Sequence, residues 1–170
     1  EMMIQLGMPT RGESRVRHWV GNGVPRLVER ALTGDLDLKP SREVFDTAYP
    51  IFLDLYAENS AIRSNLYDGV KEGLDYLQSK NYLLGCVTNK AEQFTHPLLK
   101  SLNIYDYFKI VISGDTLKKK KPDPLPLLHG ASFFNIDPKE CLMLGDSVSD
   151  VKAARAAGFD IICMSYGYNH

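Results

Sequence analysis

Residues 141–164, CLMLGDSVSDVKAARAAGFDIICM, decide the class of fold. An apolar run of strand length, Cys141–Leu144, is followed by a short polar loop. A helical pattern then extends from Val151 to Ala157, and Gly158 follows it in the position where helices commonly end. A second apolar run, Asp160–Met164, closes the stretch. This order of strand, helix and strand indicates two parallel strands joined by a crossover helix.

The same alternation extends back to about Leu66. Strand patterns occupy Tyr82–Val87 and Phe108–Ser113, and helical patterns occur near 70–77, 91–102 and 126–134. Short apolar strands separated by helices are typical of a parallel sheet with helices on both faces. We therefore predict a Rossmann-like α/β core over residues 63–170.

Helical patterns alone occupy residues 1–62. Apolar residues recur at helical spacing from Val24 to Leu32 and from Phe45 to Tyr56, and Ser41 is placed to cap the second helix. Gly21-Asn22-Gly23 predicts a turn between two helices. We expect a separate all-helical domain here. The chain begins in what looks like mid-helix and stops just after a strand, so both ends look like cuts.

Composition excludes several classes of function. Lys and Arg number 20 against 21 for Asp and Glu, a net charge of −1 that offers no basic surface for nucleic acid or an anionic membrane. No apolar run reaches the roughly 18 residues of a membrane span, and no signal-peptide pattern is present. The expected location is cytoplasmic. The cysteines Cys86, Cys141 and Cys163 lack C-x-x-C spacing, so we expect buried, reduced thiols.

Polar residues follow three of the predicted strands, where parallel sheets bind ligands. Thr88 and Asn89 follow the first strand, and Lys121 ends a four-lysine loop after the second. Asp146 and Asp150 follow the third. One rim thus collects hydroxyl and amide donors, an ammonium group and two carboxylates. This set suits a phosphate group held beside Mg²⁺.

Most of these residues also have a purely structural explanation. Thr88-Asn89 could cap the helix that follows, and Asp150 could cap a helix starting at Val151. The lysines at 118–120 are expected to be merely solvated. Asp146 has no packing role at the end of a strand between Gly and Ser. The combination, in this order, is more specific than any one part.

That combination resembles the haloacid-dehalogenase-type phosphatase superfamily. The superfamily's second, third and fourth motifs look like VTNK at 87–90, Lys121 before PDP at 122–124, and GDSVSD at 145–150. Within the superfamily, the likeness is nearest to bacterial phosphoglycolate phosphatases. It is carried by WVGNG at 19–23, KKP at 120–122, AARAAG at 153–158 and YGYN at 166–169. The resemblance covers essentially the whole chain and implies a core domain with a helical cap.

The resemblance also implies roles for the residues at the rim. Thr88 and Asn89 would bind the phosphoryl group, and Lys121 would offset charge on the nucleophile and phosphate. Asp146 would ligate Mg²⁺. Asp150 would either bind the ion through a water molecule or be an acidic residue that supports the direct ligands without touching the ion. The helical domain would close over the substrate, with Gly21, Asn22 and Gly23 reaching toward it; a plain helix–helix turn is the alternative. Closure would expel water and strengthen the electrostatics.

One family motif does not occur in this chain. D-x-D-x-T, on the central first strand of the family's core, supplies the nucleophilic aspartate, and no such sequence is found in these 170 residues. We therefore expect the nucleophile upstream of Glu1, and no aspartyl-phosphate chemistry from the chain as given. The strands at 82–87 and 141–144 should then flank an empty strand position instead of pairing with each other.

The expected activity is Mg²⁺-dependent hydrolysis of a small phosphomonoester, 2-phosphoglycolate first, by a monomer or homodimer. Another phosphatase, a sugar-phosphate mutase or a pyrophosphatase of the same superfamily is an alternative. A non-catalytic, phosphate-binding fragment is the alternative from a different class. The lysine and paired carboxylates favour phosphoryl transfer over dehalogenation but do not choose the substrate.

Overall fold

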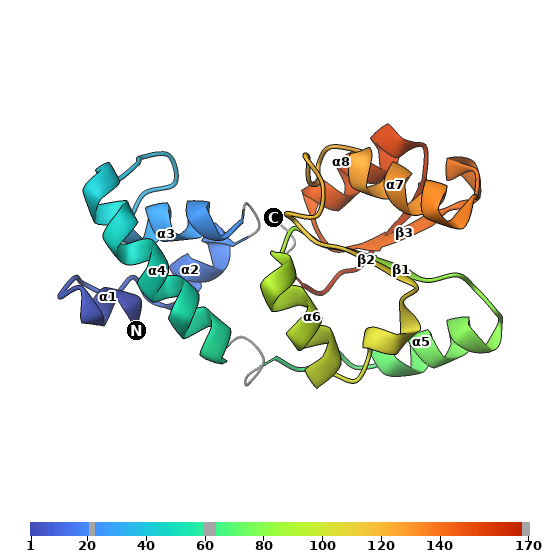
Figure 1. The fold of residues 1–170 in the computed structure, drawn as a ribbon, viewed down its shortest axis with the longest axis horizontal. Coiled ribbons are helices and arrows are strands. Elements are labelled where there is room, and N and C mark those ends of the chain that lie inside the picture. Colours follow the sequence, from blue (N-terminus) through green and yellow to red (C-terminus); the bar gives the residue numbers. More distant parts are fainter. Residues whose placement is uncertain (21–22, 60–63, 168–170) are drawn as a thin grey trace. The chain divides into compact units, whose positions relative to one another are not determined.

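The computed structural model describes residues 1–20, 23–59 and 64–167. The chain divides into two compact units, Glu1–Ile62 and Arg63–His170 (Figure 1). Over the described residues, the first unit contains helices and no strands, and the second combines helices with short parallel strands.

The first unit is built from α1 (Met2–Gln5), α2 (Glu13–Trp19), α3 (Val24–Thr33) and α4 (Arg42–Asn59). Its core centres on Val28 and Ala48, which are fully buried. The predicted cap at Ser41 is confirmed, because its hydroxyl accepts from the Val44 N–H at 3.4 Å. The apolar spacing that predicted α3 also places Val28 and Leu32 in this core.

The second unit follows the predicted order of elements. It contains α5 (Val70–Ser79), β1 (Gly85–Val87), α6 (Glu92–Ser101), η1 (Tyr105–Tyr107), β2 (Ile110–Ile112), α7 (Leu125–Phe134), η2 (Pro138–Glu140), β3 (Leu142–Gly145), α8 (Val148–Ala157) and β4 (Asp160–Cys163). The first strand is shorter than predicted. Tyr82 and Leu83 are 63% and 54% exposed, and pairing with the neighbouring strand starts only where Leu84 O accepts from Lys109 N at 2.9 Å.

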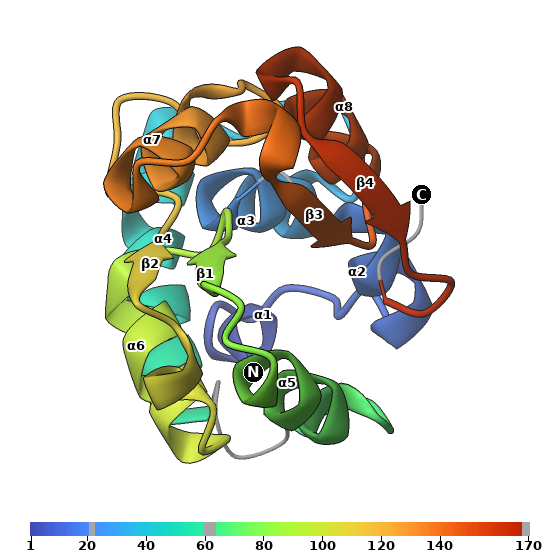
Figure 2. The same ribbon diagram turned by 90° about the vertical axis from the view of Figure 1, so that its right-hand side faces the viewer.

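The strands form two separate parallel pairs. β1 pairs with β2 and β3 pairs with β4, with Cys86 opposite Val111 and Leu144 opposite Ile162. As predicted, β1 and β3 do not pair with each other in the part of the chain that is described. Figure 2 shows the two pairs as distinct groups of arrows. Each of these strands therefore has one unpaired edge.

Helices lie on both sides of the strands, but they do not cover every face. α7 and α8 lie on one side of the strands, while α5 and α6 lie on the other (Figure 1). Leu127 of α7 and Ala153 of α8 are buried against Met143 and Ile161. The prediction of helices on both faces is wrong for β3–β4, whose other face leaves Leu142, Leu144 and Ile162 about half exposed.

No described helix has the length and apolar character needed to cross a membrane. All three cysteines are free thiols, as expected. The expected burial is wrong for Cys163, which is exposed because it ends β4 at the mouth of a surface hollow. Burial raises the pKa of the Cys86 thiol to about 11, although the charge of Lys121 opposes the shift.

Candidate active site

Thr88 follows β1 and keeps its hydroxyl proton available. Its backbone N–H donates to Ile112 O at 2.9 Å, which continues the β1–β2 ladder to the rim. Its Oγ1 accepts from the Lys90 N–H at 3.1 Å. Since a hydroxyl both accepts and donates, the Thr88 O–H can still donate to a ligand oxygen.

Asn89 holds the loop that carries Lys121. Its Nδ2 donates to the Lys121 backbone oxygen at 2.8 Å. A carbonyl accepts only from a donor, so this contact fixes which way the amide points. The Asn89 Oδ1 atom is buried and has no hydrogen-bond partner within the described chain. The Asn89 backbone N–H likewise donates to no atom of the described residues. Two groups at this position therefore remain open to a ligand or water.

Lys121 connects the two pairs of strands. Its side chain is 8% exposed, and Nζ donates to Val87 O at 2.6 Å and to Asp150 Oδ1 at 2.7 Å. Val87 ends β1, and Asp150 lies in the first turn of the helix after β3. An ammonium group has three N–H donors. Two are used within the described protein, so one remains for an anion at the rim.

Asp150 is occupied on both carboxylate oxygens. Oδ1 binds Lys121, while Oδ2 accepts from the backbone N–H groups of Asp146 and Ser147, at 3.1 and 3.0 Å, and from Ser147 Oγ at 2.7 Å. Burial disfavours the charged form, but the Lys121 charge and these hydrogen bonds outweigh it and lower the pKa of Asp150. The group is therefore an ionised carboxylate with a hydrogen bond on each oxygen.

The start of α8 differs from the sequence prediction. The helix begins at Val148 instead of Val151, with Ser147 as its N-cap and Asp150 as the reciprocal partner in a capping box. Asp150 is thus not the N-cap residue. The pattern of alanines that marked the helix begins later than its first turn, which is polar. A β-carbon on Gly145 would overlap the Asp150 side chain, which explains the glycine before Asp146.

Asp146 stands at the carboxyl end of β3 with its side chain half-buried. It lines a hollow of about 470 Å³ together with the start of α8 and Cys163. The described residues contain no group of three or more His, Cys, Asp or Glu side chains placed to hold a metal ion. Mg²⁺ usually takes only one or two protein carboxylates and keeps several waters. Asp146 fits that requirement as a candidate ligand at the end of β3. Asp150, whose oxygens accept hydrogen bonds from Lys121, Ser147 and the Asp146 backbone, is placed to orient these groups or to act on the ion through water.

The neighbouring lysines differ from Lys121. Lys119 Nζ pairs with Asp123 Oδ2 at 2.9 Å, and its side chain is 64% exposed. The hydrogen bond from Lys119, followed by that from the Leu125 N–H, lowers the pKa of Asp123. Exposed pairs of this kind contribute about 0–1 kcal/mol. Only Lys121 of the four-lysine loop is buried at the rim.

Ser113 is a residue that the motifs did not single out. It follows β2 next to Thr88 in the ladder, is 3% exposed, and its Oγ has no hydrogen-bond partner in the described protein. Its backbone N–H donates to Thr116 Oγ1 at 2.9 Å. The available signal was a polar residue at the end of an apolar run, which is too common to predict a role.

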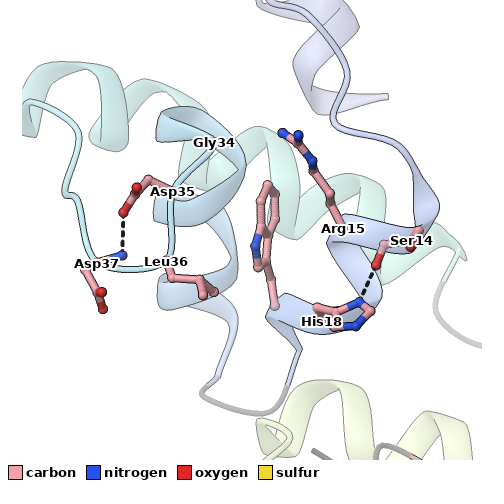
Figure 3. Close-up of a pocket in the computed structure, with 8 residues that line it drawn as sticks. Ser14, Arg15, His18, Gly34, Asp35, Leu36 and Asp37 are labelled. Atoms are coloured by element: carbon pink, nitrogen blue, oxygen red, sulfur yellow. Dashed lines mark hydrogen bonds between the residues drawn. The ribbon is translucent and has the colours of Figure 1, made fainter.

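A larger hollow, of about 570 Å³, lies in the first unit (Figure 3). It is lined by α2 and the loop after α3. Two of its polar side chains make hydrogen-bond contacts with the backbone of residues only a few positions away in the sequence. His18 Nδ1 lies 2.8 Å from Ser14 O, and the Asp35 carboxylate accepts from the Asp37 N–H at 2.7 Å. No predicted site residue falls here. Of the predicted cap loop, Gly21 and Asn22 lie outside the described residues, and Gly23 is the N-cap of α3.

The chain belongs to the haloacid dehalogenase-like hydrolase family, whose model matches residues 24–164. It is a homologue of phosphoglycolate phosphatases. It is 62% identical over 169 residues to the enzyme of Nitrosococcus oceani, covering 99% of this chain and 75% of that one. The Thiobacillus denitrificans enzyme is 48% identical over 168 residues, with 99% and 74% covered.

Solved structures agree with this assignment. A predicted phosphoglycolate phosphatase from Haemophilus somnus superposes with a TM-score of 0.90 at 32% identity, over 99% of this chain and 76% of that chain. A putative beta-phosphoglucomutase from Thermotoga maritima has a TM-score of 0.72 at 25% identity, over 98% and 75%. The family fold is therefore shared by proteins described with different activities.

Proposed function

We propose that the intact protein is a Mg²⁺-dependent phosphatase that hydrolyses 2-phosphoglycolate. The observation that carries the proposal is the buried Lys121, fixed between Val87 and Asp150 with one N–H unused. Identity of 62% to a phosphoglycolate phosphatase supports the choice of substrate.

The residues after β1 and the lysine bind the phosphoryl group in this account. The Thr88 hydroxyl and the Asn89 backbone N–H donate to phosphoryl oxygens, since neither donates within the described chain. The third N–H of Lys121 also donates to a phosphoryl oxygen. The positive charge of Lys121 offsets the negative charge that develops as the phosphoryl group is transferred. Fixed donors of this kind act without reorganising during the reaction. The Asn89 side chain contributes by holding the Lys121 loop.

Asp146 and Asp150 have different roles in this proposal. Asp146 ligates Mg²⁺, and Asp150 orients Lys121 and the backbone of the Asp146 loop. When bound, the ion neutralises charge on the phosphoryl oxygens. The hydrogen bonds support this division, because both oxygens of Asp150 already bind groups of the loop and Lys121.

The nucleophile comes from outside these 170 residues in this proposal, because they contain no D-x-D-x-T. The unpaired edges of β1 and β3 are the place for a strand that would carry it. The chain alone would then be inactive. The helical unit would act as the cap.

A mutase is the second candidate, because the structural relatives include a putative beta-phosphoglucomutase. The higher identity to phosphatases favours hydrolysis. The deciding experiment incubates the intact protein and Mg²⁺ with 2-phosphoglycolate, hexose phosphates and pyrophosphate and measures released phosphate. Isomerised hexose phosphate without release of phosphate would reject the phosphatase.

A further inference from the structure

Residues 164–167, which follow β4, lie against the loop that carries Asp146. The Met164 N–H donates to Gly145 O at 2.8 Å, one step beyond the last paired residues of β3 and β4. This bond fixes the start of the segment beside the residue that precedes Asp146.

Gly167 packs directly on the Asp146 carboxylate. A β-carbon added to Gly167 would overlap Oδ2 and Cγ of Asp146. Its φ of 101° also lies in the region that L side chains rarely adopt. Any other amino acid at this position would have to displace the carboxylate or the segment itself.

Tyr166 anchors the segment to another part of the same unit. Its ring centroid lies 4.6 Å from that of Tyr67, with the ring planes tilted by 37°. Tyr67 precedes Gly69, the N-cap of α5. The segment is therefore attached on one side to β3 and on the other to the chain just before α5.

We propose that residues 164–167 form a positioning strap for Asp146. The Gly167 backbone limits the rotation of the Asp146 carboxylate to the orientation that ligates Mg²⁺, and the Tyr67–Tyr166 contact keeps the strap in place. This inference rests on the proposed function, which makes Asp146 a magnesium ligand. Gly167 and Tyr166 are positioning residues, since they act only through Asp146. Removing a group that orients a metal ligand typically weakens metal binding by about 10- to 100-fold.

Gly158 provides a matched control for Gly167. Its φ is 79°, and an added β-carbon would have no atom within 4 Å. Gly158→Ala and Gly167→Ala therefore place a side chain at positive φ in both cases, but only the second displaces Asp146. Mn²⁺ is the probe, and the electron paramagnetic resonance signal of the free ion reports binding to the intact protein without substrate or turnover.

Gly167→Ala should raise the Mn²⁺ dissociation constant by about tenfold or more, and Gly158→Ala should leave it unchanged. Tyr166→Ala and Tyr67→Ala should raise it less than Gly167→Ala does, and Tyr166→Phe should raise it less than Tyr166→Ala because the ring is kept. Thermal unfolding of each variant identifies those that fold. If Gly167→Ala does not fold, Tyr166→Ala and Tyr166→Phe still test the strap. Equal Mn²⁺ affinity in Gly167→Ala and Gly158→Ala, or in Tyr166→Ala and Tyr166→Phe, would overturn the strap.

Asp146→Asn separates the two proposals. Loss of Mn²⁺ binding in Asp146→Asn, with no difference between the glycine variants, rejects the strap and keeps the metal role of Asp146. Unchanged Mn²⁺ binding in Asp146→Asn rejects the metal role, and the strap with it.

Discussion

Lys121 Nζ lies 2.7 Å from Asp150 Oδ1, and both side chains are buried, at 9% and 6% exposure. The pair spans the two separate strand pairs, because Lys121 also binds Val87 O at the end of β1 while Asp150 sits at the start of α8. Its position makes it both a structural link and the centre of the candidate site. Variants must therefore separate these two contributions.

Lys121→Ala should lower kcat/KM by about 10²-fold in the intact protein, as losing an electrostatic donor to the reacting group typically does. It should also lower the free energy of unfolding by about 3–5 kcal/mol, because Asp150 is left buried and unpaired. The double variant Lys121→Met/Asp150→Asn should recover most of that stability and none of the activity. Urea unfolding and steady-state kinetics measure the two effects.

Lys119→Ala is the control for the lysine loop, since its pair with Asp123 is exposed. Its kcat/KM should stay within about twofold of wild type. Equal losses in Lys119→Ala and Lys121→Ala would mean that the loop acts only by its total charge.

Asp150→Asn should change how the free energy of unfolding depends on pH. The folded protein holds the pKa of Asp150 below its ordinary value, so the unfolded chain binds the proton more readily. The stability that this ionised group contributes is full above the unfolded pKa of about 3.9 and is lost as pH falls through the folded pKa. The difference in unfolding free energy between wild type and Asp150→Asn should thus be constant from about pH 5 to 8 and shrink below about pH 4. A gap that widens in acid would contradict the ion pair.

Ser113→Ala should be neutral or slightly stabilising. The Ser113 hydroxyl is buried without a hydrogen-bond partner in the described protein, and removing such a group relieves a desolvation cost of about 1–3 kcal/mol. A loss of stability greater than about 1 kcal/mol would show that the hydroxyl binds a water molecule or ligand. Thermal and urea unfolding of the intact protein test this, with Ser132→Ala, on α7, as an exposed control.

Much of the molecule was predictable from local patterns. Apolar spacing located α3 and α5, the alternation of strands and helices gave the parallel pairs, and the end of α8 followed from Gly158. The start of α8 was missed because capping by Ser147 and Asp150 depends on hydrogen bonds that spacing does not reveal. The exposed face of β3–β4 was missed because apolar residues in a strand pattern do not show which face a helix covers.

The sequence nominates the residues of the candidate site, and their roles stay predictions. Thr88, Lys121 and Asp146 follow strand ends in the sequence, so a parallel sheet brings them to one rim. Asp150 binds Lys121, and Asn89 binds the Lys121 carbonyl. Both are contacts between elements that are distant in the sequence, which local patterns do not reveal. Gly167 had no local signal, because its constraint comes from Asp146, far away in the sequence.

The central claim is that this rim is a magnesium-dependent phosphatase site selective for a small carboxylated phosphomonoester. The most direct measurement is phosphate release by the intact protein from a panel of phosphomonoesters and pyrophosphate, with and without Mg²⁺, for wild type and Asp146→Asn. The account predicts that 2-phosphoglycolate has the highest kcat/KM, that turnover requires Mg²⁺, and that Asp146→Asn abolishes it while the protein stays folded. Turnover by Asp146→Asn within a few-fold of wild type, or a clear preference for hexose phosphates or pyrophosphate, would contradict it.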